Sequence, residues 1–138
     1  MVALHAEREQ NARSFTHARH LFVLMVLVFV SLCSAACDDK QALKARAERG
    51  DPQAQNQLSW AYYKGEGVER DDAEAVKWAR LSAARGLAAA QVNLGVMYHK
   101  GEGVGRDDTE AVKWYRLAAA QGFARAQMSL GIMYHNGH

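Results

Sequence analysis

The chain is dominated by an internal repeat with a period of 36 residues. Residues 54–89 and 90–125 align without a gap, and 23 of the 36 aligned positions are identical. A third copy begins at Ala126 and continues to the last residue, His138. A period of 20–50 residues is typical of proteins that stack one small structural unit on the next. This repeat limits the possible folds more than any other feature of the sequence.

Each copy contains two helical patterns separated by a glycine-rich loop. In the second copy, Ala90, Leu94, Met97 and Tyr98 have the spacing i, i+4, i+7, i+8, which places them on one helix face. Gly101 then stands where a helix C-cap favours a left-handed residue.

A second helix is expected directly after each loop. Asp71 with Glu74, and Asp107 with Glu110, have the spacing of a helix N-cap and its N3 partner. One helix-turn-helix hairpin cannot bury both of its apolar faces, whereas a stack of hairpins can. The sequence therefore predicts an all-α fold, an α-solenoid with about six short helices after an N-terminal signal segment.

The predicted organisation follows from the repeat boundaries. It comprises a signal peptide at 1–36, an N-terminal capping helix at 37–53, repeats at 54–89 and 90–125, and a partial third repeat at 126–138 that holds only its first helix. Solenoids usually need about three repeats for stability. Self-association of this short array is therefore left open.

Sixteen positions of the second copy carry a recognisable pattern: Ala90, Gln91, Leu94, Gly95, Met97, Tyr98, Gly101, Gly103, Val104, Asp107, Ala111, Trp114, Tyr115, Ala118, Ala119 and Gly122. This pattern resembles the Sel-one-like repeats of bacteria, which are relatives of the tetratricopeptide repeats. The first copy departs from it at Ser59, Ala61 and Ala79, where small residues suggest looser packing. The resemblance implies an α-solenoid whose first helices line the concave surface.

The N-terminal region has the order of a secretory signal. A segment with several arginines precedes the apolar run Leu21–Val30, and the small residues of SLCSAAC follow it. The apolar run is shorter than the 17–25 or so residues that a membrane-spanning helix needs. We therefore expect export.

Residues Ser34–Cys37 resemble a bacterial lipoprotein box, which makes Cys37 a lipidation candidate. An ordinary signal peptidase could equally cleave after Ala36, and the sequence leaves both outcomes open. With lipidation, Asp38 resembles the residue that retains lipoproteins in the inner membrane of some bacteria. The expected location is the periplasm, tethered to the inner membrane, or outside the cell.

No residue pattern predicts catalysis, a metal or a cofactor. The loop GEGVGR lacks the Lys-Ser/Thr of a phosphate-binding loop. His99 and His135 share one repeat position, but two histidines without a third ligand make a poor zinc site. A net charge of +2 without a basic stripe argues against nucleic acid as a partner.

One enzymatic alternative comes from the resemblance. Cysteine-rich members of this repeat family are linked to β-lactamase activity, and they carry a disulfide in each repeat. Because no cysteine follows Cys37, an envelope hydrolase of that kind is disfavoured. The other alternative is a structural or inhibitory partner that acts as an oligomer.

Positions that change between repeats are free to specify a ligand. One such stripe on the first helices consists of Asn56, Trp60, Tyr63, Val92, Val96, His99, Met128, Ile132 and His135. We predict that this stripe binds an unknown peptide or protein, anchored by Trp60 and Tyr63, since aromatic anchors dominate binding energies. The alternative is that its apolar members pack against neighbouring helices. Trp78 and Trp114, which recur at one repeat position, are predicted to be core residues.

Overall fold

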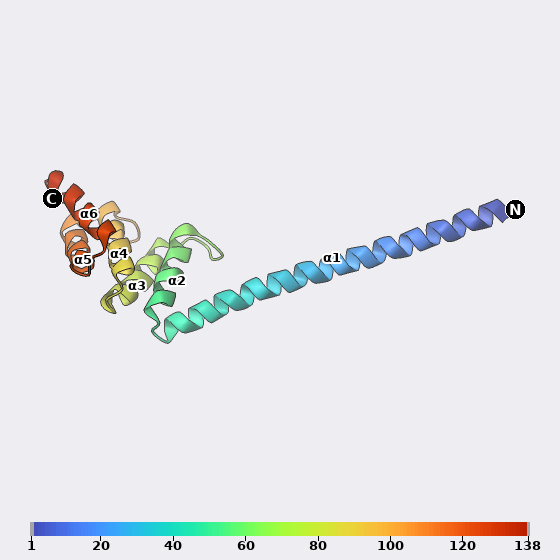
Figure 1. The fold of residues 1–138 in the computed structure, drawn as a ribbon, viewed down its shortest axis with the longest axis horizontal. Coiled ribbons are helices and arrows are strands. Elements are labelled where there is room, and N and C mark those ends of the chain that lie inside the picture. The colour runs from blue at the N-terminus through green and yellow to red at the C-terminus, as the bar shows by residue number, and fades with distance from the viewer. Residues whose placement is uncertain (1, 138) are drawn as a thin grey trace. The chain divides into compact units, whose positions relative to one another are not determined.

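The computed structural model describes the backbone of residues 2–137 and the side chains of 15–32 and 38–137. It divides into two compact units, Met1–Asp39 and Lys40–His138. The described backbone contains six α-helices: α1 Val2–Glu48, α2 Pro52–Lys64, α3 Asp72–Ala84, α4 Ala88–Lys100, α5 Asp108–Ala120 and α6 Ala124–His135 (Figure 1).

The expected capping helix is the C-terminal part of a much longer helix. Helix α1 runs without a break from Val2 through the predicted signal segment to Glu48. The physical reason is that the first glycine of the sequence, Gly50, and its single proline, Pro52, both follow α1. Gly50 then ends the helix with a φ of 93°, in the left-handed region that favours glycine.

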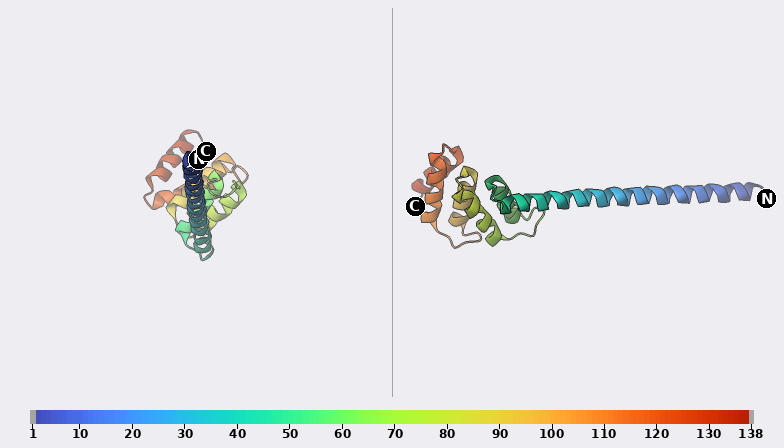
Figure 2. Two further views of the ribbon diagram at one scale, coloured as in Figure 1. Left: turned by 90° about the vertical axis from the view of Figure 1, so that its right-hand side faces the viewer. Right: turned by 90° about the horizontal axis from the view of Figure 1, so that it is seen from below.

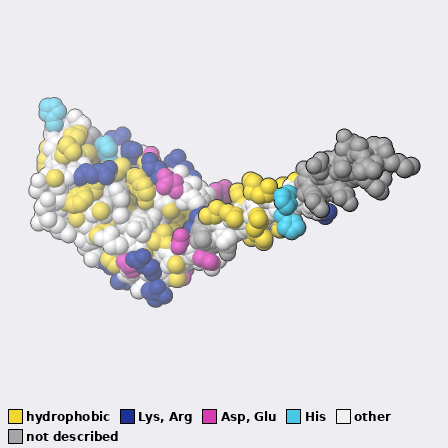
Figure 3. All heavy atoms as spheres, turned by 45° about the vertical axis from the view of Figure 1, so that its right-hand side comes forward, with side chains coloured by type: hydrophobic (Ala, Val, Ile, Leu, Met, Phe, Trp, Pro, Cys, Tyr) yellow, Lys and Arg dark blue, Asp and Glu magenta, His cyan; other side chains and the backbone are white. Residues whose placement is uncertain are grey.

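The N-terminal unit exposes its apolar side chains. Phe15–Leu32 forms an 18-residue helical stretch with a mean hydropathy of 1.8, none of which is buried. Figure 3 shows hydrophobic side chains gathered along this helix, with histidine side chains beside them. The stretch is long and apolar enough to cross a membrane, and a signal sequence near an N-terminus has the same properties.

The repeat unit is a row of antiparallel helical hairpins. Each helix from α2 to α6 packs against the next one in the chain, as two views of the ribbon show (Figures 1 and 2). The backbone N–H of Asp71 donates to the carbonyl of Tyr62 at 3.1 Å, and that of Asp107 donates to Tyr98 at 2.9 Å. The two hairpin loops are therefore closed by the same hydrogen bond, 36 residues apart.

The predicted N-caps are confirmed. The Asp71 carboxylate accepts hydrogen bonds from the N–H groups of Ala73 and Glu74, both at 3.0 Å, and Asp107 accepts one from Glu110 at 3.0 Å. These carboxylates satisfy backbone donors that have no partner within the helix, which explains their place in each repeat.

The core of the repeat unit consists of separate clusters of buried residues along the stack of helices. One cluster joins α3 to α4 through small and medium residues such as Val76, Ala79 and Leu94. Trp78 is 8% exposed and packs with Ala54 and Leu58 of α2. Trp114 packs against the α3–α4 cluster. The core prediction is confirmed for Trp78, whereas Trp114 is half-buried at the edge of its cluster.

A glycine permits a close approach of α4 and α5 in the second hairpin. A Cβ on Gly95 of α4 would lie 2.6 Å from Cε1 of Tyr115 on α5. In the first hairpin the matching pair is Ser59 and Ala79, which are 1% and 0% exposed. The Ser59 hydroxyl donates to the carbonyl of Ala75 at 2.7 Å. Looser packing is therefore not seen at Ser59 and Ala79, because the larger Ser59 accompanies the smaller Ala79, while at Ala61 it stays a prediction.

A second repeated contact joins each hairpin to the following first helix. The Arg80 guanidinium of α3 donates to the Tyr98 hydroxyl of α4 at 2.8 Å. One repeat later, Arg116 of α5 donates to the Tyr134 hydroxyl of α6 at 2.7 Å. Each guanidinium also lies within 6 Å of the ring centroid, at 5.6 and 5.8 Å, a range in which cation–π attraction adds to the hydrogen bond. These pairs fasten successive hairpins at their surface.

Replacing Gly95 by alanine tests the close approach. Gly95→Ala is expected to lower the free energy of unfolding by about 1–3 kcal/mol, because the added methyl displaces the Tyr115 ring. Urea denaturation of the full chain, followed by far-UV circular dichroism, measures this change.

Gly131→Ala is the matched control, since Gly131 stands at the same repeat position with no atom within 4 Å of its added Cβ. That control is expected to stabilise α6 by about 0.5–1 kcal/mol, because alanine loses less entropy than glycine in a helix. Equal effects of the two substitutions would refute the role of Gly95.

Candidate functional site

Two adjoining pockets lie on the first helices of the repeats. Their volumes are about 310 and 180 Å³, and they share Trp60, Asn93 and Arg125. We call the combined depression the groove. Its lining consists of Asn56, Gln57, Trp60, Tyr63, Lys64, Ala89, Asn93, Val96, Met97, Lys100, Phe123 and Arg125. The lining comes from α2, α4, the start of α6 and its N-cap Phe123.

Trp60 provides the main aromatic surface of the groove. Its side chain projects from α2 and is 40% exposed, in contrast to the buried Trp78. The Trp60 and Tyr63 ring centroids are 5.5 Å apart. The Lys64 ammonium lies 5.0 Å from the centroid of the Trp60 ring, a distance at which a cation is attracted to the aromatic face. This cluster presents an apolar face and a positive charge together.

Tyr63 is held by the following repeat. Its hydroxyl donates to the Glu102 carboxylate at 2.8 Å, and the Lys100 ammonium donates to the same hydroxyl at 3.5 Å. In addition, the Arg70 guanidinium lies 5.8 Å from the Tyr63 ring centroid. Arg70 also donates to the Asp72 carboxylate, and this hydrogen bond lowers the pKa of Asp72. The Tyr63 end of the groove is therefore fixed in place.

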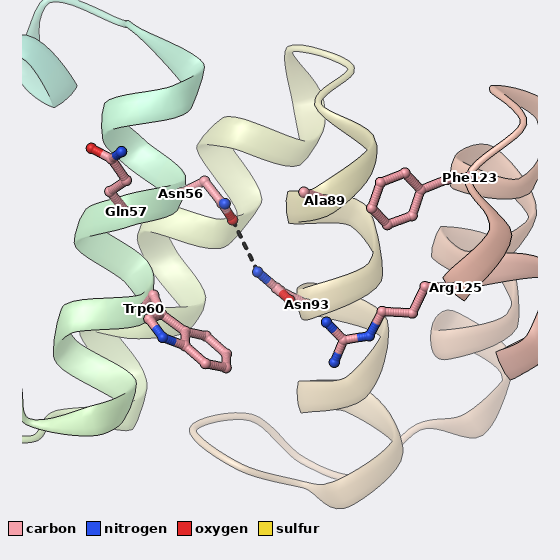
Figure 4. A pocket seen from close by; sticks show the side chains of 7 residues that line it. All are labelled: Asn56, Gln57, Trp60, Ala89, Asn93, Phe123 and Arg125. Carbon is pink, nitrogen blue, oxygen red and sulfur yellow. Dashed lines mark hydrogen bonds between the residues drawn. The ribbon is translucent and has the colours of Figure 1, made fainter.

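A pair of amides crosses the groove from one repeat to the next. The Asn93 side-chain amide of α4 donates to the Asn56 side-chain oxygen of α2 at 3.0 Å. Figure 4 shows this hydrogen bond at the centre of the pocket, with Trp60 and Arg125 pointing toward Asn93 from opposite sides. Each side-chain amide has two N–H donors and an oxygen acceptor. Amides placed in this way can bind the N–H and C=O groups of an extended peptide.

The structure brings together four residues of the predicted stripe. Asn56, Trp60, Tyr63 and Val96 all line the groove. Val92 is a correction, because it is only 1% exposed and packs in the α4–α6 core with Tyr115. It cannot contact a ligand in the groove.

The other four predicted residues line neither pocket. His99 forms a 2.6 Å hydrogen bond with the Asp108 carboxylate of α5. Met128 and Ile132 are 65% and 57% exposed on α6, and His135 is also exposed. For these residues, contact with a partner stays a prediction.

On α4 the residues that line the groove are mostly shifted by one position from the predicted stripe. Asn93 and Arg125 were missed, together with Gln57, Lys64 and Lys100. A signal for three of them was present, because Gln57, Asn93 and Ser129 differ at one repeat position and Gln53, Ala89 and Arg125 differ at another. A helix turns about 100° per residue, so a shift of one residue separates Val92 in the core from Asn93 in the groove.

The chemistry of the groove is that of non-covalent binding. It combines aromatic, amide and cationic side chains. Among the residues whose side chains are described, no three His, Cys, Asp or Glu groups lie close enough to hold a metal ion. The side chain of Cys37 is outside the described residues, so its proposed lipidation stays a prediction.

Comparison with known proteins gives the family. The model of the Sel1 repeat matches residues 52–87, 88–123 and 124–138, with the same 36-residue period. No curated protein sequence matches.

Two solved structures are similar to the repeat unit. One is c5321 of Escherichia coli, described as a protective antigen of uropathogenic strains with an SLR fold. It is 48% identical with a TM-score of 0.68, over 69% of this chain and 20% of that one. The other is a Sel1 repeat protein from Oxalobacter formigenes, 45% identical with a TM-score of 0.65, over 72% of this chain and 74% of that one.

The chain thus spans about a fifth of the E. coli protein and about three quarters of the O. formigenes protein. The predicted all-α solenoid is confirmed. Because the family model covers more than half of the chain, the protein belongs to the Sel1 repeat family.

Proposed function

We propose that the chain is a non-catalytic protein-interaction scaffold whose groove binds a peptide or a segment of a partner protein. Membership of the Sel1 repeat family suggests a scaffold of this kind. The observation that supports the groove as the binding surface is its continuity over α2, α4 and the start of α6, with the partly exposed Trp60 at its centre.

The repeat pattern supports the same proposal. Leu58 and Leu94 match between repeats and are buried, as a common fold requires. Trp60 has Val96 at the matching position, so stacking does not demand a tryptophan there. A large aromatic side chain left partly in water at a variable position is typical of a binding anchor.

We propose in addition that the protein is exported and acts in the bacterial envelope. The exposed apolar stretch Phe15–Leu32 supports a signal or anchor segment, and both similar structures come from bacteria. Lipidation of Cys37 would tether the repeat unit to the membrane without a spanning helix. The hydrolase alternative has no support in the repeats, since the two cysteines, Cys33 and Cys37, both precede them.

Site-specific photo-crosslinking in living cells tests the binding surface. A photo-crosslinking residue in place of Trp60 or Asn93 is expected to give a discrete adduct with another protein. The same residue in place of Leu81 or Leu117 serves as the control, because both are exposed on second helices, outside the groove. Adducts formed equally from all four positions, or from none, would contradict the proposal.

The two tryptophans of the first repeat are expected to behave oppositely. Trp78→Ala is expected to cost about 3–5 kcal/mol of unfolding free energy, because it removes a buried ring. Trp60→Ala is expected to cost about 1 kcal/mol or less, since much of its ring is in water, while abolishing the adduct formed from position 93. Urea denaturation and crosslinking measure the two effects. A large loss of stability for Trp60→Ala would identify it as a core residue.

The intact mass of the protein from a membrane fraction tests the N-terminal processing. Cleavage before Cys37 with an added diacylglyceryl group is the expected result, and Cys37→Ser is expected to abolish both. A cleaved chain without lipid would indicate a soluble exported protein. An uncleaved chain would contradict signal processing and leave Phe15–Leu32 as the anchor.

A further inference from the structure

The charges that line the groove have one sign. Lys64, Lys100 and Arg125 contribute three cations, and none of the described residues that line the groove carries a carboxylate. Over the whole chain, by contrast, basic and acidic side chains nearly balance, at 17 and 15. The positive lining is therefore a local property of this surface.

Two of the three cations are available to an incoming anion. Arg125 is exposed and forms no ion pair with any described residue, and the same is true of Lys64, which lies over the Trp60 ring. Lys100 is engaged more loosely, with its ammonium 3.9 Å from the Glu102 carboxylate at the rim. A cation in a partly apolar groove attracts a carboxylate more strongly than one in open water, because the surrounding dielectric is lower.

The folding of the repeats does not demand a cation at position 125. The positions that match Arg125 are Gln53 and Ala89, both of which lie on equally formed first helices. Arg80 and Arg116 differ in this respect, because both fasten successive hairpins through tyrosines. Arg125 therefore stands at a position where the fold accepts a neutral side chain.

The arrangement combines three kinds of contact. Trp60 offers an apolar face, Asn56 and Asn93 offer amides, and Arg125 and Lys64, which lies over the Trp60 ring, offer positive charges. We propose that the groove binds an extended acidic segment of a partner protein, with its carboxylates at Arg125 and Lys64 and an apolar side chain against Trp60. This inference rests on the proposed function and adds the chemical class of the ligand.

Three decapeptide libraries of equal length and hydrophobic content test the proposal. The first contains Asp and Glu between Leu, Phe and Gly, the second has Asn and Gln in their place, and the third has Lys and Arg. Binding to the full-length protein in a neutral detergent is measured by fluorescence anisotropy at low and at physiological salt. The acidic library is expected to bind best, and its binding is expected to weaken with salt, because ions screen exposed charges.

Charge reversal locates the contact. Arg125→Glu and Lys64→Glu are each expected to weaken binding of the acidic library about tenfold or more, the effect expected for losing a hydrogen bond to a charged group. Lys44→Glu is the matched control, because Lys44 is exposed on α1 and lines neither pocket. It changes the net charge by the same amount and is expected to change binding less than about twofold, because a distant exposed charge is largely screened.

The possible outcomes distinguish the proposed acidic ligand from the more general proposal that the groove binds a partner. Neutral or basic peptides that bind as well as acidic ones, and lose binding on Trp60→Ala, would overturn the acidic ligand but leave the groove as a binding site. Acidic peptides that bind equally to Arg125→Glu and Lys44→Glu would also overturn it. Preferential binding of vesicles of anionic lipid, lost on Arg125→Glu, would assign the cations to a membrane surface instead. If no library binds and position 60 gives no adduct in cells, the proposed function itself fails.

Discussion

The close approach of neighbouring helices is the contact on which the repeat unit depends. It is made where small side chains face larger ones. In the second hairpin, the Tyr115 ring leaves no room for a Cβ on Gly95. In the first hairpin, Ser59 is buried at the matching position, and α3 carries Ala79 instead of a tyrosine. Protein interiors are packed nearly as densely as crystals. A larger side chain on one helix therefore requires a smaller one at the facing position of its neighbour. The distance between the helices, and with it the position of the groove, follows from these pairs.

Polar contacts that repeat every 36 residues also fix the alignment of the hairpins. The loop hydrogen bonds of Asp71 and Asp107 set where each second helix begins. The arginine–tyrosine pairs then fix the next hairpin against the last one. Across the groove the contacts do not repeat, since Asn56–Asn93 and Tyr63–Glu102 have no counterpart of the same residue types one repeat later. The scaffold is thus regular, whereas the contacts across the groove differ from one repeat to the next.

The sequence predicted the helices, their caps and the role of Trp78 because each depends on local spacing that recurs. It placed the groove on the first helices, and Trp60 and Tyr63 in it, for the same reason. It failed at Val92, because the variation that marked the stripe does not tell a buried position from an exposed one. Arg125 was missed because its approach to Trp60 depends on how the third hairpin packs on the second. The change in composition near residue 37 does not predict the continuous α1, which passes through it because no glycine or proline stands there to end a helix.

The unbroken helix α1 would give the predicted signal cleavage a structural effect beyond removing the N-terminal segment. A cut between residues 36 and 37 would turn the middle of a helix into its beginning, with the shortened helix still packed through Ala47 against α2. Asp38 and Asp39, which are mid-helix residues in the full chain, would then lie in a first turn, where carboxylates interact favourably with the positive end of the helix dipole. The segment that follows the cut therefore already holds the acidic residues suited to a new helix N-terminus, so the mature end of the solenoid would need no rearrangement.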